Sequence, residues 1–535
     1  MSRTRKYKDS RPVAVASFAF LSRICTVLLQ VLFTNLIPDH QADAFHLDSI
    51  TDPSTSDKAL HFLINGFSKW DASYFLHIAQ HGYTRAEMFA FFPLYPFTVR
   101  LMADLVIQPL QHLLSLHMSL YSCVLISAVT LNVIFFCSAA VLLYYLGVEV
   151  LSCHKLAYKA ALLFCINPAS VFMTAAYTES LFALLSFAGM LALECRKVLL
   201  SALLFSLSCT VRSNGIISVA FLLYCFMKRS TDLLTYFGKM IQRESKHKLS
   251  AAWNVIQNHC ADILVTASLL PWCLVILLPF ILFQVYSFML ICTSERDLVT
   301  VLAMYVCAQD VTVLADTVPS WCRHSRLLPY AAIQSQHWNV GFLRYYEVKQ
   351  VPNFLLALPM VILCAGAVLN YCKKRWKYVC VLGLLETPEV QLEYKRTMSG
   401  NPWLGMYSNK SLVYMVQLAS LVIFGVTCMH VQVVTRFIAS SCPLVFWYAA
   451  HLTMDKNTES QRCSPGRQTK SHQHNDTKQN EYCSNASLLD LSKNDLIVQY
   501  MSWHEQSYST RLVLAYFIGY CIIGTAMHCN FLPWT

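Results

Sequence analysis

Long apolar stretches recur along the whole 535-residue chain, and short polar segments separate them. A run of about 18 or more apolar residues is long enough for a helix that crosses a bilayer. The composition agrees, because 56% of the residues are hydrophobic and only 13% are charged, whereas soluble domains contain about 25% charged residues. The sequence therefore predicts an all-α polytopic membrane protein with about 11–13 transmembrane helices.

Basic residues indicate how these helices are oriented. The net charge is +11, and Lys and Arg cluster in short segments between apolar stretches, notably residues 3–11, 228–248 and 373–377. Such clusters stay on the cytosolic side of a membrane. The segments 38–87 and 292–350 then become lumenal loops. No basic stripe or base-reading motif accompanies the charge, which argues against a nucleic-acid partner.

The chain divides by polarity into a membrane domain, an insert and a last span. Residues 1–452 form the membrane domain, and its first apolar stretch is expected to be a retained signal anchor. Residues 453–508 are polar and predicted to be disordered. They carry sequons at Asn475 and Asn485, which would stay unused in the cytosol, where the predicted helix order places them. Residues 509–535 supply the final transmembrane helix and the C-terminal tail.

Two long apolar stretches of the membrane domain contain polar interruptions. Residues 101–150 are too long for one span and predict a helical hairpin. Residues 160–194 predict two spans that meet near Tyr177.

The 22 cysteines give little sign of a metal site. No paired Cys-x-x-Cys motifs have zinc-like spacing, and many cysteines lie within apolar stretches, where they pack as small hydrophobic residues. Cys292, Cys307 and Cys322 fall in the second lumenal loop and are candidates for a disulfide in an oxidising compartment. The chain also lacks GxGxxG, Walker A and HExxH motifs. We predict no metal ligands and no cofactor.

A polar, ring-rich segment after the first apolar stretch contains Trp70 and Asp71, followed by Tyr74, His81 and Tyr83. A carboxylate beside a membrane span is costly to place and rare without a function, and it can take a proton from an attacking hydroxyl. The alternative is that Asp71 only starts the next helix, as Asp commonly does. The neighbouring rings favour a site at the membrane–water boundary, with Asp71 as its acid or base.

A second carboxylate, Glu179, follows Tyr177 in an apolar setting. Intramembrane carboxylates usually face the protein interior, so a substrate-binding role competes with N-capping of the next helix. Three isolated arginines near predicted lumenal boundaries are candidates for binding phosphate, because a guanidinium matches two phosphate oxygens. They are Arg212, Arg344 and Arg436, and His430 with Arg436 is the best such pair. For any one arginine, snorkelling to lipid headgroups is an equally good explanation.

The second lumenal loop brings aromatic, amide and basic side chains together over residues 334–346. The candidates for substrate contact are His337, Trp338, Asn339, Arg344 and Tyr345. Aromatic rings and amides suit the stacking and hydrogen bonding of a sugar. The alternative is an aromatic belt at the membrane interface, which would not need so many amides, so a ligand role is favoured.

Short motifs that span most of the chain carry a family resemblance. In chain order they are Trp70-Asp71 with Tyr74-Phe75, His77-Ile78-Ala79, His81-Gly82-Tyr83 and Phe89-Ala90-Phe91-Phe92-Pro93-Leu94, then Asn167-Pro168-Ala169, Tyr177-Thr178-Glu179-Ser180, Arg212-Ser213-Asn214-Gly215, Trp338 to Tyr346 and His528 to Thr535. With these motifs the chain resembles the PIG-V family, the second mannosyltransferases of glycosylphosphatidylinositol (GPI) anchor assembly. The polar insert lies outside the resemblance.

The resemblance implies a GT-C-type glycosyltransferase of the endoplasmic reticulum (ER) membrane. Its donor would be dolichol-phosphate mannose, which is a substrate and not a cofactor, and its acceptor the GPI-anchor precursor bearing one mannose, joined by an α-1,6 bond. Such enzymes invert the anomeric centre, and the acidic residue of the first lumenal loop, here Asp71, is their usual base. A small accessory membrane subunit is a possible partner.

Three other functions stay open from the sequence. A non-catalytic subunit of an ER glycosylation complex and a different lipid-linked mannosyltransferase share the expected architecture. A lipid-linked-sugar transporter or flippase would require charged residues near the middle of the membrane and often a repeated half. The polar residues concentrate instead on one side, and no repeat is visible.

Overall fold

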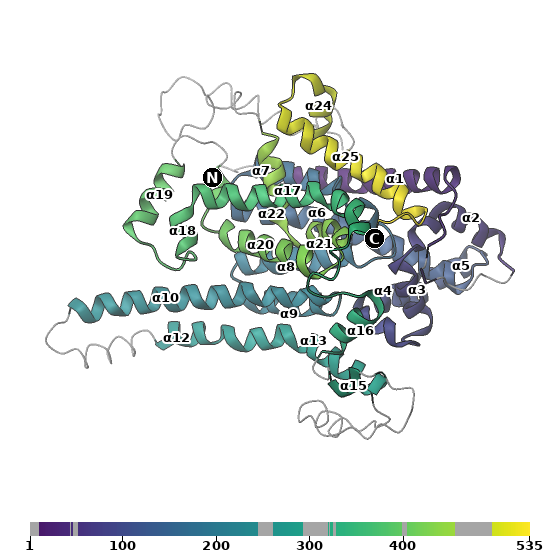
Figure 1. Cartoon of the computed structure of the whole chain (residues 1–535), viewed down its shortest axis with the longest axis horizontal. Coiled ribbons are helices and arrows are strands. Elements are labelled where there is room, and N and C mark those ends of the chain that lie inside the picture. Colours follow the sequence, from purple (N-terminus) through teal and green to yellow (C-terminus); the bar gives the residue numbers. More distant parts are fainter. Residues whose placement is uncertain are drawn as a thin grey trace, which may run out of the picture.

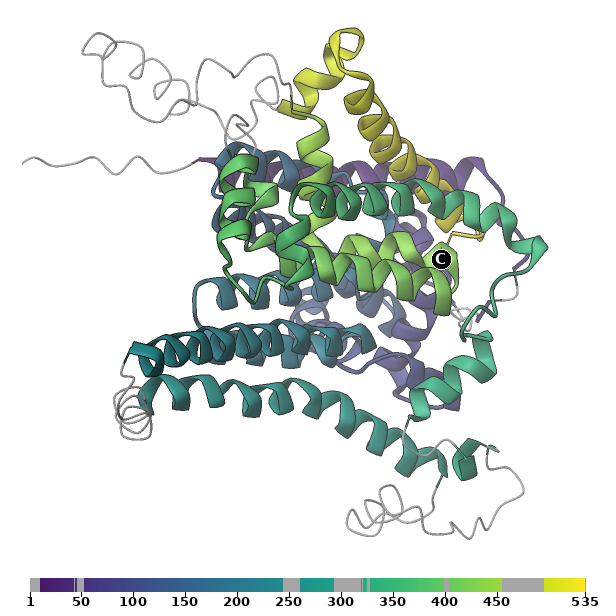
Figure 2. The same ribbon diagram turned by 60° about the vertical axis from the view of Figure 1, so that its left-hand side comes forward.

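The computed structural model describes residues 10–42, 44–45, 52–243, 260–292, 319, 321–324, 328–398, 404–454 and 495–534. Over these residues the chain is helical and contains no strand. Long helices run side by side through one bundle, and shorter helices lie at its ends (Figures 1 and 2). The predicted all-α architecture is confirmed for this part of the chain.

Six helical stretches of the described residues are long and apolar enough to cross a membrane. They are Arg11–Leu36 (α1), Leu120–Leu151 (α6), Asp262–Cys292 (from α12, Cys260–Ala267, and α13, Leu269–Cys292), Val348–Lys374 (η6, Val348–Gln350, and α17, Val351–Lys374), Ser411–Cys428 (α20) and Tyr508–Cys529 (α25). A seventh candidate is a pair of helices that meet at 88°. The pair consists of η8 (Val431–Val433) with α21 (Val434–Ser441), and α22 (Pro443–Leu452). Proline at the start of α22 lacks the N–H that would continue α21.

These candidates are fewer than the 11–13 spans predicted, because several apolar stretches form shorter helices. Two of them, α7 (His154–Cys165) and α8 (Glu179–Glu194), lie on either side of the break predicted near Tyr177, but neither is among the candidate spans. They are followed by α9 (Val198–Cys209) and α10 (Val219–Arg243).

The hairpin predicted over residues 101–150 is wrong, because α6 is a single helix of 32 residues. Ser119 starts it by accepting a hydrogen bond from the Ser122 N–H, a capping contact that hydropathy does not reveal. The preceding residues form α4 (Leu94–Met102), a π-helical turn (η3, Ala103–Ile107) and α5 (Gln108–Leu113).

The centre of the bundle is α6, which packs against α1, α7 and α8. Further out, α25 packs on α1, α22 on α7, and α13 on α9. Arg23 of α1 is only 1% exposed and donates to the backbone oxygens of Ser170 at 2.7 Å and Cys165 at 3.1 Å. A buried charge is tolerated when its N–H groups are bonded, so Arg23 ties α1 to the connection between α7 and α8.

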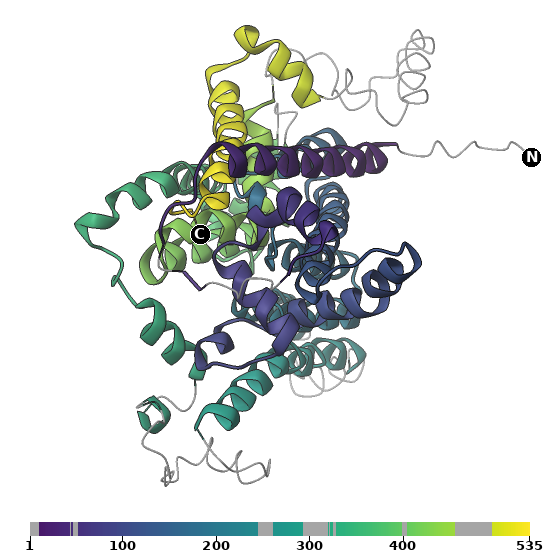
Figure 3. The same cartoon turned by 90° about the vertical axis from the view of Figure 1, so that its right-hand side faces the viewer.

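The two ends of the bundle carry different elements (Figures 1 and 2). One end, which Figure 3 views face-on, holds α2 (Thr55–Ile64), η1 (Asn65–Ser68), α3 (Asp71–His81), η2 (Ala86–Ala90) and α16 (Pro329–Trp338). The other end holds the second half of α10 with α18 (Trp376–Cys380), α19 (Pro388–Met398) and η7 (Leu404–Tyr407). The basic segments of α10 and of the α17–α18 junction therefore lie at the end opposite to α3.

Parts of the second predicted loop and of the polar insert are described. Cys292 and Cys322 form a disulfide, which confirms one of the candidate pairings, and Cys307 lies outside the described residues. The short helix α15 (Trp321–His324) follows this bond. Residues 455–494 of the insert, with both sequons, also lie outside the described residues. Its last part is helical, as α24 (Asp495–Met501) and η10 (Trp503–Glu505).

Candidate active site

Asp71 is the first residue of α3, and the backbone just before it is strained. Trp70 has φ 60° and ψ −131°, a conformation that is costly for a bulky residue. Its ring packs against Phe531, with centroids 5.6 Å apart, and the Asp71 N–H donates to the Tyr177 hydroxyl at 3.2 Å. The N-cap of α3 is Trp70 and not Asp71, so the alternative interpretation, in which Asp71 only caps this helix, is wrong. The Asp71 carboxylate instead bonds Arg436.

Four charged side chains from distant parts of the chain meet next to this helix start. Arg436 donates from Nη2 to Asp71 Oδ2 at 2.7 Å and from Nη1 to Glu179 Oε1 at 3.4 Å. Arg212 bonds the same Glu179 oxygen from its own Nη1. Glu179 therefore lies between two guanidinium groups, and the two positive and two negative charges of this cluster cancel. We call Asp71, Glu179, Arg212 and Arg436 the charge cluster.

Burial distinguishes the members of the charge cluster. Asp71 is the most exposed, with 27% of its side chain accessible, whereas Arg436 is 9% exposed. Arg212 is 15% exposed and Glu179 is fully buried, at 0%. Within the described structure, Glu179 Oε2 and Arg436 Nε are buried without a hydrogen-bond partner. Asp71 is therefore the carboxylate of the cluster that a substrate can reach.

The elements that carry the charge cluster explain why it forms. Glu179 opens α8, Arg212 precedes the short helix η5 (Ser213–Ser218), and Arg436 lies in α21, which packs against α8. The Arg436 guanidinium carbon lies 5.2 Å from the ring centroids of both Phe172 and Tyr177. These rings stabilise a buried cation through cation–π contacts.

A wall of aromatic rings continues from Asp71. Tyr74 lies one helical turn further along α3 and so shares its face. The Tyr74 ring stacks on Phe45 and on Phe91, each at 4.7 Å, and meets Trp338 edge-on at 6.1 Å. Since Trp338 belongs to α16, both predicted lumenal loops contribute to one site. We call these four rings the aromatic wall, which offers apolar faces of the kind that line ligand sites.

His430 supports the aromatic wall and is not paired with Arg436. Its Nε2 lies 2.7 Å from the Trp338 backbone oxygen, and its ring stacks on Tyr345 at 4.6 Å. Burial lowers the pKa of His430, although the bond to Trp338 and the Asp71 charge oppose this shift. After His430, η8 is followed at once by α21, and Arg436 of α21 bonds both carboxylates.

Several predicted site residues lie away from the charge cluster. His81 is at the far end of α3, about 15 Å along the helix axis from its first residue. Tyr83 donates its hydroxyl to the Phe91 backbone oxygen at 2.7 Å. Arg344 is exposed and donates to Ser335 Oγ at 2.6 Å. The His81 ring lies 5.0 Å from that of His77, and the Tyr83 ring also lies 5.9 Å from that of Phe283 in α13.

The remaining predicted residues of the second loop belong to the end of α16. Asn339 follows the helix in a left-handed conformation, with φ 51°, which asparagine tolerates well. His337 is exposed beside Trp338, with ring centroids 5.8 Å apart. Asn353 donates to the hydroxyl of Tyr345 at 2.8 Å. Of this group, Tyr345 contacts the site indirectly, because its ring stacks on His430, which bonds the Trp338 backbone.

Tyr330 and Ser213 were not predicted from the sequence but belong to the site. The Tyr330 hydroxyl and Ser213 Oγ are 3.0 Å apart. Burial raises the pKa of Tyr330, and Asp71 raises it further, whereas the Ser213 bond and the Arg212 charge lower it. The bond to Ser213 places the Tyr330 hydroxyl next to the residue that follows Arg212. Ser213 could have been found from its position beside Arg212, but no local signal marks Tyr330.

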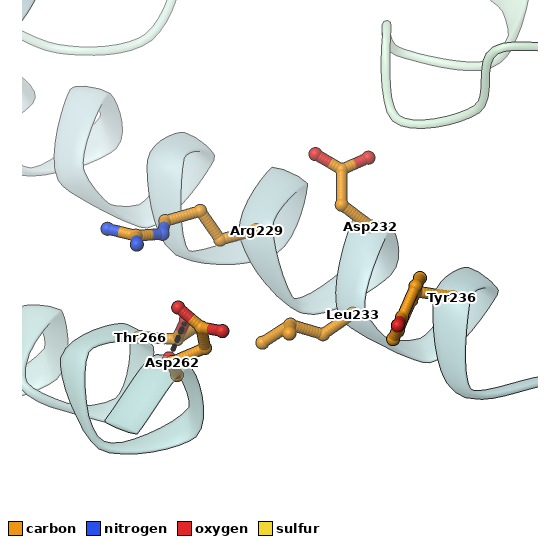
Figure 4. A pocket seen from close by; sticks show the side chains of 6 residues that line it. All are labelled: Arg229, Asp232, Leu233, Tyr236, Asp262 and Thr266. Carbon is orange, nitrogen blue, oxygen red and sulfur yellow. Dashed lines mark hydrogen bonds between the residues drawn. The ribbon is translucent and has the colours of Figure 1, made fainter. Parts of the chain in front are cut away.

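A separate cavity of about 300 Å³ lies between α10 and α12, at the end of the bundle opposite to α3 (Figure 4). Its lining residues are Arg229, Asp232, Leu233, Tyr236, Asp262 and Thr266. No predicted site residue lines it. Among the residues that the structure describes, no group of three or more His, Cys, Asp or Glu side chains is placed to hold a metal ion.

The fold and the charge cluster define a multi-span α-helical membrane protein with a carboxylate site at one end of its bundle. The model of the family described as "Mannosyltransferase (PIG-V)" matches residues 12–535. Proteins named GPI alpha-1,6-mannosyltransferase 2 from Mus musculus and Homo sapiens are each 38% identical to the chain, cover 98% and 99% of it, and match over 99% of their own length. GPI mannosyltransferase 2 from Drosophila melanogaster is 30% identical, over 82% of this chain and 90% of its own.

The chain belongs to the PIG-V mannosyltransferase family and is therefore a glycosyltransferase. Among solved structures, the apo form of an oligosaccharyltransferase from Archaeoglobus fulgidus aligns with 97% of the chain and 56% of its own length, with 12% identity and a TM-score of 0.40. A likeness at that level carries no argument about the site.

Proposed function

We propose that this chain transfers mannose from dolichol-phosphate mannose to the GPI-anchor precursor that bears one mannose. The product bond is α-1,6, and transfer occurs at the lumenal face of the ER membrane. The observation that carries the proposal is the accessible Asp71 carboxylate, held at 2.7 Å by Arg436 beside the aromatic wall. It is supported by 38% identity to relatives named GPI alpha-1,6-mannosyltransferase 2.

Asp71 acts as the base in an inverting transfer. The acceptor hydroxyl attacks the anomeric carbon from the face opposite to the leaving phosphate, and its proton passes to Asp71. The bond between the anomeric carbon and the phosphate oxygen breaks, and its electron pair leaves with dolichyl phosphate. Arg436 bonds the charged, proton-accepting form of Asp71. The leaving phosphate needs cationic or N–H donors but no proton, so one carboxylate is enough.

Both proposed substrates are lipids, so their head groups meet at a membrane surface while their chains stay in the bilayer. The basic segments of α10 and of the α17–α18 junction lie at the opposite end of the bundle from α3. Basic segments favour the cytosolic side, which supports a lumenal site. The donor already carries an activated sugar, so the proposal includes no metal and no nucleotide cofactor.

The proposal is tested in cells that lack the second mannosylation step of GPI assembly. We expect the wild-type chain to clear the accumulated one-mannose lipid. Asp71→Asn, expressed at the same level, should lower transfer by about 10²- to 10⁴-fold, the usual contribution of a general base. Asp104→Asn is the matched control, since Asp104 is a half-exposed carboxylate bonded to Arg100 at 2.7 Å, and it should retain transfer.

Each competing function predicts a different outcome. Full activity of Asp71→Asn would remove the base role and favour a non-catalytic subunit. Failure of the well-expressed wild-type chain to clear the lipid would overturn the assigned step. Transfer by the purified chain in nanodiscs would exclude any requirement for the accessory subunit.

A further inference from the structure

The three arginines predicted to bind phosphate have different partners in the structure. Arg344 is exposed and bonds Ser335 within its own loop. Arg436 and Arg212 both belong to the charge cluster and share Glu179. The question is which of these two can accept a further anion.

Arg436 is already committed to carboxylates. Its Nη2 bonds Asp71 and its Nη1 bonds Glu179. Its Nε is buried within the described structure and reaches no acceptor. Only 9% of its side chain is exposed, against 15% for Arg212, so its remaining N–H groups are less accessible to a ligand that arrives from outside the cluster.

Arg212 is held on one side and open on the other. Its Nη1 bonds Glu179 and also Thr178 Oγ1, the latter at 3.0 Å. Within the part of the chain that the structure describes, its Nε and Nη2 make no hydrogen bond, and they are not among the buried atoms without a partner. The side chain is 15% exposed. A guanidinium anchored at one nitrogen with two free donors is suited to bind two oxygens of one anion.

Arg212 belongs to the same ion-pair network as Asp71. Glu179 bonds both Arg212 and Arg436, and Arg436 bonds Asp71. The cluster itself is neutral, because its two carboxylates balance its two guanidinium groups. An arriving anion therefore needs donors that are not already bonded, and Arg212 supplies them.

We propose that Arg212 binds the phosphodiester of the lipid donor, that Arg436 is a positioning residue for Asp71, and that buried Glu179 holds both arginines. This division of roles rests on the proposed function, in which the donor is a lipid phosphodiester. As the bond from the anomeric carbon to the phosphate oxygen breaks, negative charge grows on the phosphate, and Arg212 stabilises it. The proton of the acceptor hydroxyl moves to Asp71, whose orientation Arg436 maintains.

Lipid binding measured without mannose transfer tests this division. The probes are radiolabelled dolichyl phosphate and uncharged dolichol, each titrated onto the purified full chain in nanodiscs. We expect Arg212→Gln to weaken binding of dolichyl phosphate by about 10- to 100-fold, the worth of charge-assisted hydrogen bonds, and to leave dolichol binding unchanged. Arg212→Lys should recover part of the loss, because it keeps the charge without the planar fork.

The Arg436 variant should keep lipid binding and lose transfer. Arg436→Gln should bind dolichyl phosphate within about threefold of wild type, less than one charge-assisted bond, while losing transfer. Arg100→Gln removes another arginine that bonds a carboxylate, Asp104, at 2.7 Å, and it should keep both binding and transfer. Thermal melting of each variant identifies those that do not fold, and Arg212→Lys then replaces Arg212→Gln.

Two results would overturn the division. Loss of dolichyl phosphate binding in Arg436→Gln with retention in Arg212→Gln would reverse the roles, and normal binding in both would place the phosphate elsewhere. Asp71→Asn separates this proposal from the proposed function, since it should bind dolichyl phosphate normally and fail to transfer. A wild-type chain that binds dolichyl phosphate through Arg212 but does not mannosylate the GPI precursor would refute only the proposed function.

Discussion

Arg23 and Arg436 are both buried arginines beside the connection between α7 and α8, yet their partners differ. Arg23 is 1% exposed, and within the described structure it bonds only neutral acceptors: the backbone oxygens of Ser170 and Cys165 and three side-chain hydroxyls. It also lies 3.9 Å from the ring centroid of Phe136. Arg436 bonds two carboxylates, one of which is accessible.

The chemistry of these partners distinguishes a structural arginine from one that belongs to a reactive site. Neutral acceptors cannot change charge during a reaction, so the Arg23 network fixes one arrangement of the helices and nothing more. A carboxylate can gain and lose a proton, and an accessible one can exchange it with a substrate. Arg436 therefore serves a site, while Arg23 serves the fold. Burial of a charge alone does not distinguish the two; the chemistry of its partners does.

Of the two arginines, Arg436 should have the larger effect on mannose transfer. Arg436→Gln leaves Asp71 without its cation, and we expect mannose transfer to fall by about 10²- to 10³-fold, in line with the loss of a preorganised charged group. The measurement is kcat with dolichol-phosphate mannose in nanodiscs. Combined with Asp71→Asn, the change should cost no more than Asp71→Asn alone, because the two residues act as a unit. Multiplicative losses would show that they act independently.

A smaller and different effect is expected at Arg23. Arg23→Leu leaves several buried acceptors without donors, and each costs about 1–3 kcal/mol, so we expect the free energy of unfolding to fall by about 3 kcal/mol or more. Denaturant or thermal unfolding in detergent measures this loss. Transfer per folded molecule should stay close to wild type. A loss of kcat as large as that of Arg436→Gln, at unchanged stability, would erase the distinction between the two arginines.

The smallest effect is expected at Asp57, the acidic counterpart of Arg23. Asp57 of α2 is 4% exposed, and within the described structure its carboxylate accepts hydrogen bonds only from neutral donors, which include the backbone N–H and hydroxyl groups of Ser54 and Ser119. Burial opposes its ionisation, but hydrogen bonds from Ser122, Ser119 and Ser54 outweigh burial and lower its pKa from 3.8 to about 2. Asp57→Asn should lower the free energy of unfolding by about 1–2 kcal/mol, the worth of a helix cap, with no change in kcat.

The pH dependence of this effect has a definite sign. Because the pKa of Asp57 is lower in the folded chain, its stabilisation is fully present above pH 3.8 and is lost as the pH falls through about 2. The thermal midpoints of wild type and Asp57→Asn should therefore converge in acid. A gap that stays constant down to pH 2 would show that the carboxylate charge plays no part.

The fold and part of the site were predictable because they rest on local or compositional signals. Apolar stretches announce membrane helices wherever they occur, and Cys292 and Cys322 stood out within one loop. Asp71 and Glu179 stood out because carboxylates are expensive near a bilayer. The hairpin predicted over residues 101–150 failed because hydropathy does not register the cap at Ser119 that starts α6.

The roles of the arginines were not predictable in this way. Arg212, Arg344 and Arg436 look alike in the sequence, since each is an isolated cation near an apolar stretch. Arg344 bonds Ser335, only 9 residues away along the chain. The partner of Arg212, Glu179, is 33 residues away, and that of Arg436, Asp71, is 365 residues away. Tyr330 gave no signal at all, because its partner Ser213 is 117 residues away.

The sequence by itself determined that this chain is a helical membrane protein and to which family its motifs belong. It also identified the carboxylates whose placement beside a membrane costs too much free energy to be without a function. Only the tertiary structure decided that Arg436 meets Asp71, that Glu179 lies between two guanidinium groups, and that Arg212 keeps free donors. The physical reason is range. Hydrophobicity and the cost of a charge act at each residue wherever it stands, whereas an ion pair forms only when packing brings two distant side chains within about 4 Å.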